Sequence, residues 1–432
     1  MHATNLTSQE IITSILIVGA GPAGIAAAVA AAAHAQGIVI LDENSEAGGQ
    51  IWRRGLDASH PQGAALYAQL VEQPHVQCVF GARVIAVVDA HRLMVETPHG
   101  VKIIQWDKLI VCTGARELLL PFPGWTLPGV TGAGGLQALI KSGADLSGRR
   151  VVVAGTGPLL LAVAATVKKA GGEVVAVVEQ RPLSRLWTFA SALFFHHRPK
   201  WWQALGLLWM IKPWRYKLGT VVSAAQGVTQ VQSVSLQTDH GCEEVACDVL
   251  ACGFGLRSNL ALADVLLCQS IDGAITVNEQ QRTSQPHIWA AGEATGIAGV
   301  DKALIEGRIA GFSATDQPLS TEDMAKRNHA QHFARLLQKT FNVDPRLAQL
   351  CQPDTLVCRC EDVAAKELTP FSDWRTAKLM TRVGMGACQG RICGAACEFL
   401  YGWEAPEARQ PVFPAKASSL AMLAEPLPKS RQ

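Results

Sequence analysis

Residues 15–43 constrain the fold of this chain more than any other stretch. The stretch opens with an apolar run at 15–18, which has the length of a buried parallel strand. Gly19, Gly21 and Gly24 follow with the spacing G-x-G-x-x-G. In a dinucleotide-binding unit the first glycine allows a tight turn and the second admits a pyrophosphate. The third lets the helix pack closely on the strand.

The residues after this turn complete the unit. Pro22 and Ala23 lie inside the motif, and an alanine-rich run at 25–34 predicts a helix whose N-terminus faces the phosphates. A second strand is expected at 38–41, and Asp42 and Glu43 follow it. A carboxylate at this place can bond a ribose hydroxyl. The whole pattern favours a bound dinucleotide over a glycine-rich turn in an ordinary α/β unit.

The composition excludes several classes of protein. A chain of 432 residues exceeds one core, so two or three domains are expected. The net charge of +2 gives no reason to expect a nucleic acid partner, and no apolar run is long enough for a transmembrane segment. Without a signal peptide pattern, the 12 cysteines indicate thiol or metal chemistry in a cytoplasmic protein.

A second unit of the same kind is expected after a Pro- and Gly-rich linker. A strand at 151–154 leads into Gly155 and Gly157, then a helix at 159–170, and a strand that ends at Glu179. Leu160 occupies the third glycine position, so helix and strand cannot approach as closely. These residues predict either a nicotinamide or adenine nucleotide site or a retained scaffold with an altered or empty pocket.

An aromatic insert at 184–218 interrupts this second unit. It holds five of the chain's 11 tryptophans, and basic residues break it up, so it cannot span a bilayer. Exposed aromatic patches with basic residues often mark contact surfaces. The insert is interpreted first as an interface with a partner protein. Packing on its own chain and association with a membrane surface are the alternatives.

A third motif, at 288–293, is a strand that ends in Gly292 and Glu293. Together with the two glycine turns, in this order, it resembles the two-domain flavoprotein disulfide reductase architecture. The resemblance implies FAD, with the second dinucleotide fold inserted into the FAD domain. It places Asp42 or Glu43 at the adenosine ribose and Glu293 near the ribitol and phosphates, although aspartate is usual at this last position. The other residues that it implies near FAD are Val84 (adenine) and Thr113 and Gly114 (pyrophosphate).

Disulfide reductase activity does not carry over. Those enzymes place a Cys-x-x-Cys or Cys-x4-Cys pair against the flavin, whereas this chain has Gly48, Gly49 and Gln50 after its first glycine motif. Cys242, Cys247 and Cys252 lie on strand-like sequence and are interpreted as structural.

Four other cysteines form two close pairs near the C-terminus: Cys358 with Cys360, and Cys388 with Cys393. Four thiolates in two pairs can hold one metal centre. The pattern is similar to the domain related to bacterioferritin-associated ferredoxin, which implies a [2Fe-2S] cluster, although the linker between the pairs is a few residues short. A zinc site and unliganded buried cysteines are the alternatives. Cys397 is interpreted as a packing residue.

Taken together, these motifs resemble the α (or A) subunits of opine oxidases and of hydroxyproline and proline dehydrogenases, and the flavoprotein subunit of hydrogen cyanide synthase. Gly49 and Gln50 belong to a segment that looks like that group. The resemblance implies a hetero-oligomer in which a separate subunit, of the amino-acid-oxidase type, oxidises an amino or imino acid. This chain would relay the electrons to an acceptor, without catalytic residues of its own. A second nucleotide (NAD(P) or ATP), or FMN at a subunit interface, is an additional cofactor to consider.

The expected fold class is α/β, with two Rossmann-like domains and a small helical [2Fe-2S] domain. The FAD domain is expected at 14–119 and 245–316, the NAD(P)-like domain at 120–244 and the cluster domain at 351–403. A linker helix (317–350) and an extended or disordered tail (404–432) complete the chain. The main rival function is a self-sufficient NAD(P)H-dependent reductase in which Gly155, Gly157 and Glu179 hold the nucleotide. A non-enzymatic assembly subunit is a further alternative.

Overall fold

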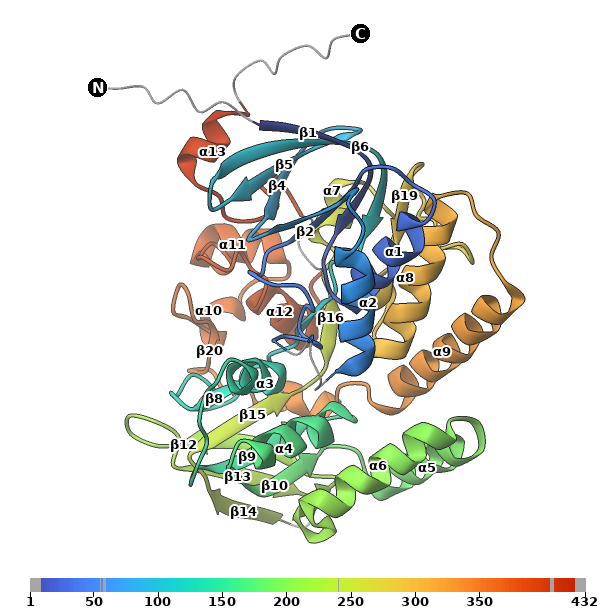
Figure 1. Ribbon diagram of the computed structural model, residues 1–432. Coiled ribbons are helices and arrows are strands. Elements are labelled where there is room, and N and C mark those ends of the chain that lie inside the picture. Colours follow the sequence, from blue (N-terminus) through green and yellow to red (C-terminus); the bar gives the residue numbers. More distant parts are fainter. Residues whose placement is uncertain (1–8, 55, 57–59, 240, 405–407, 424–432) are drawn as a thin grey trace. The chain divides into compact units, whose positions relative to one another are not determined.

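The computed structural model describes all residues except 1–8, 55, 57–59, 240, 405–407 and 424–432. The chain divides into two compact units (Figure 1). The first contains residues 1–115, 258–334 and 407–432, and the second contains 116–257 and 335–406. No helix in the described part of the chain is long and apolar enough to cross a bilayer.

A sheet with the strand order β3-β2-β1-β6-β5-β4 forms the centre of the first unit, and β19 also pairs with β6. Strands β1, β2, β3 and β19 run parallel to their neighbours, whereas β4, β5 and β6 form an antiparallel meander. The strands are β1 (Gln9–Val18), β2 (Ile38–Asp42), β3 (Val76–Phe80), β4 (Arg83–Asp89), β5 (Arg92–Thr97), β6 (Gly100–Val111) and β19 (Ile288–Ala290).

Helix α1 (Pro22–Ala32) packs against α8 (Val300–Ala314) through small residues. A Cβ atom added to Gly307 would lie 2.1 Å from the carbonyl oxygen of Ala23, and one added to Gly311 would lie 2.3 Å from that of Ala27. The alanine-rich sequence of α1 is therefore explained by a contact with a helix almost 280 residues later. The remaining elements here are α2 (Pro61–Val71), α7 (Ala261–Val265), β17 (Ser270–Ile271), β18 (Ala274–Ile275), η2 (Gly292–Thr295), α9 (Thr321–Thr340) and α13 (Ala417–Ala421).

The second unit has a parallel sheet with the order β11-β10-β9-β15-β8 and an antiparallel sheet with the order β12-β13-β14. The parallel strands are β8 (Val130–Gly132), β9 (Arg150–Gly155), β10 (Glu173–Glu179), β11 (Tyr216–Leu218) and β15 (Val249–Gly253). The antiparallel strands are β12 (Val221–Gln226), β13 (Ser233–Thr238) and β14 (Gly241–Ala246). Boundaries between the units lie in β7 (Ala115–Glu117), in β16 (Leu256–Ser258) and within α9, after Ala334.

Helices α3 (Ala133–Lys141) and α4 (Leu159–Lys169) belong to the same unit, and the aromatic insert forms a helical hairpin of α5 (Leu183–His196) and α6 (Arg198–Ile211). The short 3-10 helix η1 (Pro213–Arg215) follows the hairpin. The C-terminal segment adds η3 (Pro345–Leu350), β20 (Leu356–Cys358), β21 (Val363–Ala364), α10 (Ala365–Leu368), α11 (Trp374–Thr381) and α12 (Cys393–Tyr401).

Two expected domain boundaries differ from the structure. Residues 351–403 are not a separate body, because the indole N–H of Trp125 donates to the carbonyl oxygen of Leu356 at 2.7 Å, and Phe399 packs against the core of the second sheet. The tail is not extended throughout its described part: it forms α13, and both the Lys416 N–H and the Ser419 hydroxyl donate to Glu96. A single sequence cannot reveal these long-range contacts, since proline and alanine content alone favours an extended chain.

Candidate functional site

The first glycine turn has the close packing that its sequence predicts. A Cβ atom added to Gly24 would lie 1.8 Å from the carbonyl oxygen of Gly19, and one added to Gly19 would lie 2.1 Å from that of Cys112. Gly19 also has φ +110°, a conformation that L side chains rarely adopt. Any larger residue at 19 or 24 would therefore separate α1 from β1 and β6.

The N-terminus of α1 is open for a ligand. Gly21 is the N-cap residue, Pro22 begins the helix, and no side chain caps the helix end. A Cβ atom at Gly21 would approach only the Cα atom of Gly49, at 3.9 Å, within the 4 Å around it. Gly49 has φ +59°, and Gln50 beside it is exposed. Uncapped backbone N–H groups and a cradle without side chains fit the pyrophosphate of a dinucleotide such as FAD.

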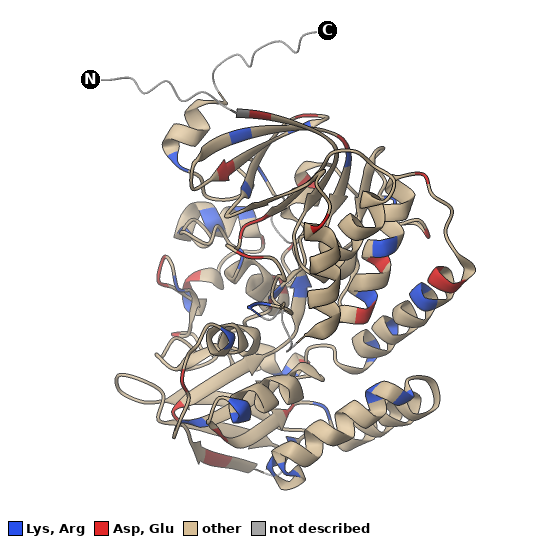
Figure 2. Ribbon diagram, in the orientation of Figure 1, with Lys and Arg blue, Asp and Glu red and all other residues tan. Residues whose placement is uncertain are grey.

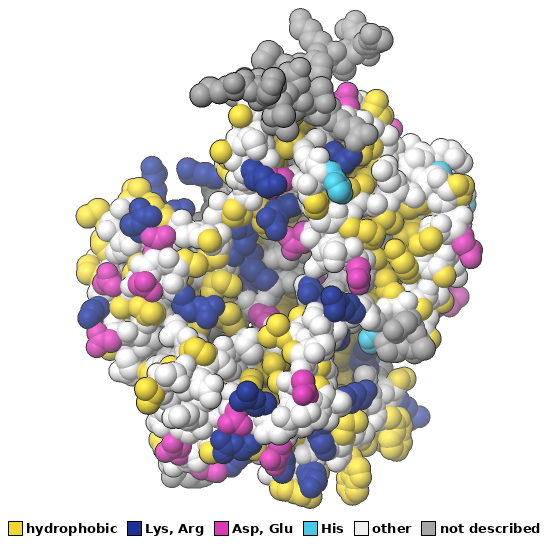
Figure 3. All heavy atoms as spheres, turned by 60° about the vertical axis from the view of Figure 1, so that its left-hand side comes forward, with side chains coloured by type: hydrophobic (Ala, Val, Ile, Leu, Met, Phe, Trp, Pro, Cys, Tyr) yellow, Lys and Arg dark blue, Asp and Glu magenta, His cyan; other side chains and the backbone are white. Residues whose placement is uncertain are grey.

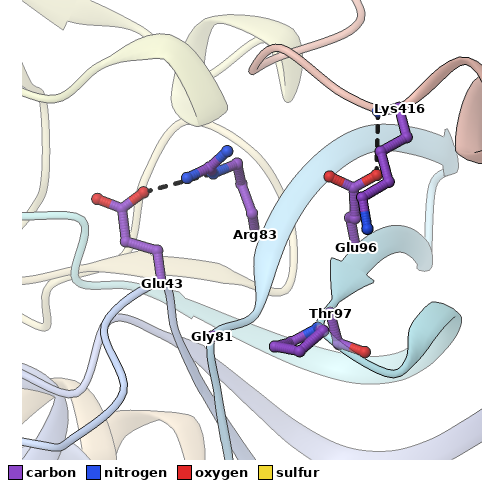
Figure 4. Close-up of a pocket in the computed structure, with 7 residues that line it drawn as sticks. Glu43, Gly81, Arg83, Glu96, Thr97 and Lys416 are labelled. Carbon is purple, nitrogen blue, oxygen red and sulfur yellow. Dashed lines mark hydrogen bonds and ion pairs between the residues drawn. The ribbon is translucent and has the colours of Figure 1, made fainter.

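The two carboxylates after β2 have different environments. Asp42 is buried, and its oxygens accept hydrogen bonds from the Ala20 N–H at 2.7 Å and from the N–H and side-chain amide of Asn44. Asp42 thus closes the glycine turn. Glu43 is exposed and lies 3.7 Å from Arg83, in a hollow of about 160 Å³ lined also by Thr97 and Lys416 (Figure 4). Of the two, Glu43 has the freedom to bond a ribose.

Other residues expected near FAD already have partners or lie in the core. Val84 is buried in the core on β4, so only its backbone can face a ligand. The Thr113 hydroxyl donates to the Asn259 carbonyl at 2.8 Å, and the Asn259 side-chain amide donates to the Thr113 carbonyl at 2.9 Å. The Asn259 N–H donates to Gly114, which has φ +66°. Asn259 therefore fixes this loop, a role that its sequence context does not indicate.

A buried ion pair supports the turn at Gly292 and Glu293. The Lys302 ammonium donates to Glu306 at 2.7 Å, to the Gly292 carbonyl and to the Thr295 hydroxyl, and Glu306 accepts from the Gly292 N–H. Lys302 and Glu306 are 4% and 1% exposed, so the pair lies in the core. Burial raises the pKa of Glu293, and Lys302 partly offsets this shift. The i,i+4 spacing of Lys302 and Glu306 is the one signal of this pair in the sequence.

The second glycine turn satisfies its own carboxylate. Glu179 is fully buried and accepts from the Thr156 hydroxyl at 2.8 Å, the Gly157 N–H at 2.8 Å and the Arg181 N–H at 3.0 Å. Burial raises the pKa of Glu179, and these hydrogen bonds oppose the rise. Glu179 therefore has the same role as Asp42, a brace for the turn.

Residues 341–346 lie against this second turn. A Cβ atom added to Gly157 would lie 3.6 Å from the Phe341 ring, whose centroid is 4.8 Å from that of Phe189 in an edge-to-face contact. Arg181 donates to both the carbonyl and the side chain of Asn342, and the Asp344 N–H donates to the Gln180 side chain at 3.0 Å. The residues that follow the expected ribose carboxylate thus bind the chain itself. No pattern in the sequence pointed to this contact.

Leu160, at the third glycine position, is accommodated by a glycine on another strand. Leu160 is fully buried, and a Cβ atom on Gly253 would lie 2.9 Å from its side chain. Gly155 in turn packs against Gly253, because its own Cβ would lie 2.0 Å from the Gly253 carbonyl oxygen. In the second turn the Leu160 side chain therefore fills the space between helix and strand. In the first turn the backbone atoms of Gly19 and Gly24 are in direct contact and leave no such space.

The four C-terminal cysteines come together in the second unit. Cys358 is at the end of β20 and Cys393 begins α12, and both are buried, whereas Cys360 is exposed. Cys388 interacts with both Cys360 and Cys393 through side-chain hydrogen bonds, and Cys358 acts on Cys360 and Cys393 electrostatically. The hydrogen bond from Cys393 lowers the pKa of Cys388 below the usual value of a thiol. The sequence prediction that these four residues belong to one site is consistent with this arrangement.

Glycines make the approach of the two cysteine pairs possible. A Cβ atom on Gly386 would lie 2.3 Å from the Cβ atom of Cys360, and one on Gly384 would lie 2.6 Å from the Trp374 ring. Among the described residues, no group of three or more His, Cys, Asp or Glu side chains has the arrangement of a metal-ion site. By their chemistry, four thiols in two pairs are a donor set that could hold a two-iron cluster.

The arginines beside these cysteines have separate roles. The Arg391 guanidinium donates to the Cys388 carbonyl at 3.2 Å, whereas Arg382 pairs with Glu361 at 2.7 Å. Arg359 lies 4.7 Å from the centroid of the Trp125 ring. Of the three, Arg391 is the one bonded to a cysteine of the set.

Of the cysteines interpreted as structural or packing residues, all but Cys242 are buried. Cys247 and Cys252 are buried, and burial raises the pKa of both, that of Cys247 to about 11. Cys242 is exposed on β14. Burial also raises the pKa of Cys397 to about 12, as expected for a packing residue.

Comparisons with known proteins bear on this geometry. The family model described as pyridine nucleotide-disulphide oxidoreductase matches residues 13–192 and 215–307. The HcnB subunit of hydrogen cyanide synthase from Pseudomonas protegens is 32% identical over 425 residues, with 88% of this chain and 90% of the relative covered. The A subunit of opine oxidase from Agrobacterium tumefaciens is 29% identical, with 88% and 84% covered.

The crystal structure of L-proline dehydrogenase from P. horikoshii has the same fold. It superposes with a TM-score of 0.69 over 96% of this chain and 80% of that one, at 17% sequence identity. The family match covers both dinucleotide units, which confirms the predicted α/β fold with Rossmann-type sheets. The chain therefore belongs to the pyridine nucleotide-disulphide oxidoreductase family, as an oxidoreductase of the group that includes the HcnB subunit of hydrogen cyanide synthase and the A subunit of opine oxidase.

Proposed function

We propose that this chain is the FAD- and [2Fe-2S]-containing electron-transfer subunit of a multi-subunit amino or imino acid dehydrogenase or oxidase. It would receive electrons from a catalytic flavoprotein subunit of the amino-acid-oxidase type and pass them to an acceptor. The observation that carries the proposal is that Cys388 forms side-chain hydrogen bonds with both Cys360 and Cys393, so that thiols of the two pairs lie in one network. By their names, the relatives above are subunits of a hydrogen cyanide synthase and of an opine oxidase, which supports a multi-subunit enzyme.

In this proposal Gly21 and the N-terminus of α1 bind the FAD pyrophosphate, and Glu43 bonds the adenosine ribose. Asp42 holds the turn, and the Lys302–Glu306 pair holds Gly292 and Glu293 in place beside the cofactor. Flavin accepts two electrons and releases them singly, and an iron–sulfur cluster carries one at a time. Cys358, Cys360, Cys388 and Cys393 would hold the cluster, and the Arg391 bond to the Cys388 carbonyl would fix its loop.

The alternative function is a self-sufficient NAD(P)H-dependent reductase. The geometry of the second turn favours the relay over this alternative. The Phe341 ring lies against Gly157 where a pyrophosphate would approach, and the oxygens of Glu179 accept three hydrogen bonds from the chain itself. Bleaching of the flavin by NADH alone would favour the reductase.

The test is spectroscopic. The full chain is purified without exposure to oxygen, and its flavin absorbance, iron content and EPR spectrum after dithionite are recorded. We expect one flavin and a reduced two-iron signal, and we expect Cys360→Ser and Cys388→Ser to remove the signal while they retain the flavin. Cys397→Ala is the matched control, since Cys397 is buried beside the set. Bound zinc with no EPR signal would contradict the cluster.

A further inference from the structure

The helical hairpin of α5 and α6 exposes large aromatic side chains. Trp187, Phe195, Trp202, Trp209 and Trp214 (the last in η1) are each between 62% and 82% exposed. A large aromatic side chain buries 150–250 Å² when it is covered, so five of them leave an unusually large apolar surface in contact with water. The family model leaves residues 193–214 unmatched, so most of this surface lies outside the fold shared by the family.

The exposed residues form a stripe along α6, opposite its buried side. Trp202, Leu205 and Trp209 have the spacing i, i+3, i+7, which places them on one face of the helix. Ile211 lies on the other side and packs in the same core as Leu161 of α4. Internal packing, one of the interpretations of the insert, therefore accounts for one side of α6 and leaves the aromatic side exposed.

All charges on this hairpin are positive. The chain has no aspartate or glutamate between Glu179 and Asp239. Figure 2 accordingly shows only Lys and Arg colours on α5 and α6. In Figure 3, hydrophobic side chains project next to basic ones along the lower edge of the face. The basic residues of the hairpin and of η1 are Arg185, Arg198, Lys200, Lys212 and Arg215, of which Arg215 pairs with Glu173 of β10 at 3.0 Å. Since the net charge of the whole chain is only +2, this element is more positive than the rest of the chain.

Two of the cations lie beside aromatic rings at the ends of α6. The Arg198 guanidinium is 5.9 Å from the Phe194 ring centroid, and the Lys212 ammonium is 5.6 Å from that of Trp214. Arg198 is the first residue of α6, and Lys212 follows its last residue. Aromatic rings with cations close to them suit the boundary of a lipid bilayer, where rings enter the headgroup region and cations contact phosphates.

We propose that the α5–α6 hairpin is a membrane-surface anchor that binds bilayers of anionic phospholipid. The exclusively positive charge is complementary to such a surface, and juxtamembrane Lys and Arg residues are attracted to it. A protein partner fits less well, because the centres of protein interfaces are depleted of lysine, and Lys200 and Lys212 flank the aromatic stripe. The hairpin lies on the surface and does not cross it, because no described helix has the length and hydropathy of a transmembrane segment.

Flotation of the full chain with lipid vesicles tests this anchor. We expect the protein to float with vesicles of phosphatidylcholine mixed with phosphatidylglycerol, and much less with phosphatidylcholine alone. High salt weakens the binding, because part of it is electrostatic. Arg198→Gln with Lys212→Gln lowers the affinity roughly twenty-five-fold, at about fivefold for each cation. Trp202→Ser with Trp209→Ser lowers it roughly a hundredfold.

The matched control is Leu267→Ser with Ile271→Ser, which removes two exposed apolar side chains (75% and 64% exposed) of the first unit. We expect this control double variant to float as the wild type does. Circular dichroism checks that every variant is folded. No flotation with the anionic vesicles would overturn the anchor. Equal flotation of the wild type and the tryptophan variant would also overturn it. The anchor would also be overturned if the tryptophan variant no longer assembled with a partner protein but still floated as the wild type does.

Discussion

The two glycine turns of this chain share a plan and differ in what lies against them. In both, a carboxylate at the end of the second strand accepts a hydrogen bond from a backbone N–H of the turn: Asp42 from Ala20, and Glu179 from Gly157. The first turn is followed by the exposed Glu43. The second is covered by Phe341, and the residue after its carboxylate, Gln180, bonds to the backbone of Asp344.

This difference shows that the strand–turn–helix fold does not by itself require a bound nucleotide. The strand–turn–helix unit forms with either kind of packing at this position. The first unit has backbone contact at Gly24, and the second has the Leu160 side chain packed on Gly253. No side chain caps the N-terminus of α1 or of α4. The two turns differ in the approach to them: within 4 Å a Cβ atom at Gly21 would meet only Gly49, whereas one at Gly157 would meet the Phe341 ring. A retained nucleotide fold is therefore weak evidence for a retained nucleotide.

The largest effect is expected when the residue of the second turn replaces that of the first. Gly24→Leu forces a side chain into the position where a Cβ alone would lie 1.8 Å from the Gly19 carbonyl oxygen. We expect loss of bound flavin and of the folded first unit, measured by flavin absorbance and circular dichroism. Gly206→Ala is the control, because it is a helical glycine with open space around it. A Gly24→Leu protein with full flavin content would contradict the packing argument.

The buried Lys302–Glu306 pair supports the turn at Gly292 in the first unit. Lys302→Met leaves the Glu306 carboxylate buried without its cation, and we expect a loss of about 3–5 kcal/mol in the free energy of unfolding. Lys326→Met is the matched control, since Lys326 and Glu322 form an exposed i,i+4 pair that is worth about 0.5 kcal/mol or less. Urea unfolding measures both. Equal losses in the two variants would show that burial of the pair does not matter.

Removal of the Leu160 side chain tests the hydrocarbon filling of the second turn. Leu160 is fully buried, so Leu160→Ala is expected to cost about 3 kcal/mol in the free energy of unfolding. Leu139→Ala, at a leucine that is 55% exposed on α3, is expected to change it by about 0.5 kcal/mol or less. A stable Leu160→Ala protein that binds NADH would indicate that the leucine only blocks a nucleotide site.

Substitution of Phe341 tests most directly whether the chain is an electron relay or an NAD(P)H-dependent reductase. Phe341→Ala removes its edge-to-face contact with Phe189, and we expect a loss of about 2 kcal/mol in the free energy of unfolding with unchanged flavin content. Because Gly157 becomes accessible, we also expect weak NADH binding, with a Kd of roughly 1 mM, that the wild type lacks. Fluorescence titration with NADH provides the measurement. Tighter binding to the wild type than to the variant would identify the second turn as a working site.

The smallest effect concerns the protonation of Glu179. Burial raises its folded-state pKa, so the folded state binds its proton more tightly than the unfolded state does. The contribution of Glu179 to stability is therefore greatest below its unfolded pKa, about 4.3, and falls as pH rises through the folded pKa. Glu179→Gln removes this dependence and costs about 1 kcal/mol near neutral pH. Urea unfolding across this pH range compares the two proteins, and parallel curves would contradict the assignment.

Local sequence predicted the parts of this protein that depend on neighbouring residues. The glycine spacing of the first turn, the second turn at Gly155 and Gly157, and the late strand before Gly292 identified two Rossmann-like units, and the family match confirms that fold. These signals are local because a strand–turn–helix needs its glycines within a few residues of each other. The cysteine pairs are visible for the same reason.

Only the tertiary structure decided which groups these units have left for a ligand. Asp42 looks like a ribose ligand in the sequence, yet in the fold its oxygens already accept hydrogen bonds from Ala20 and Asn44. Phe341 covers Gly157 from 184 residues away, and Gly253 makes room for Leu160 from another strand. Such contacts depend on shape complementarity between segments far apart in the chain, and no local pattern of residue types encodes it. The sequence by itself therefore determined the fold and the residues that could bind a cofactor. Packing decided which of those residues are left without a partner from the chain itself.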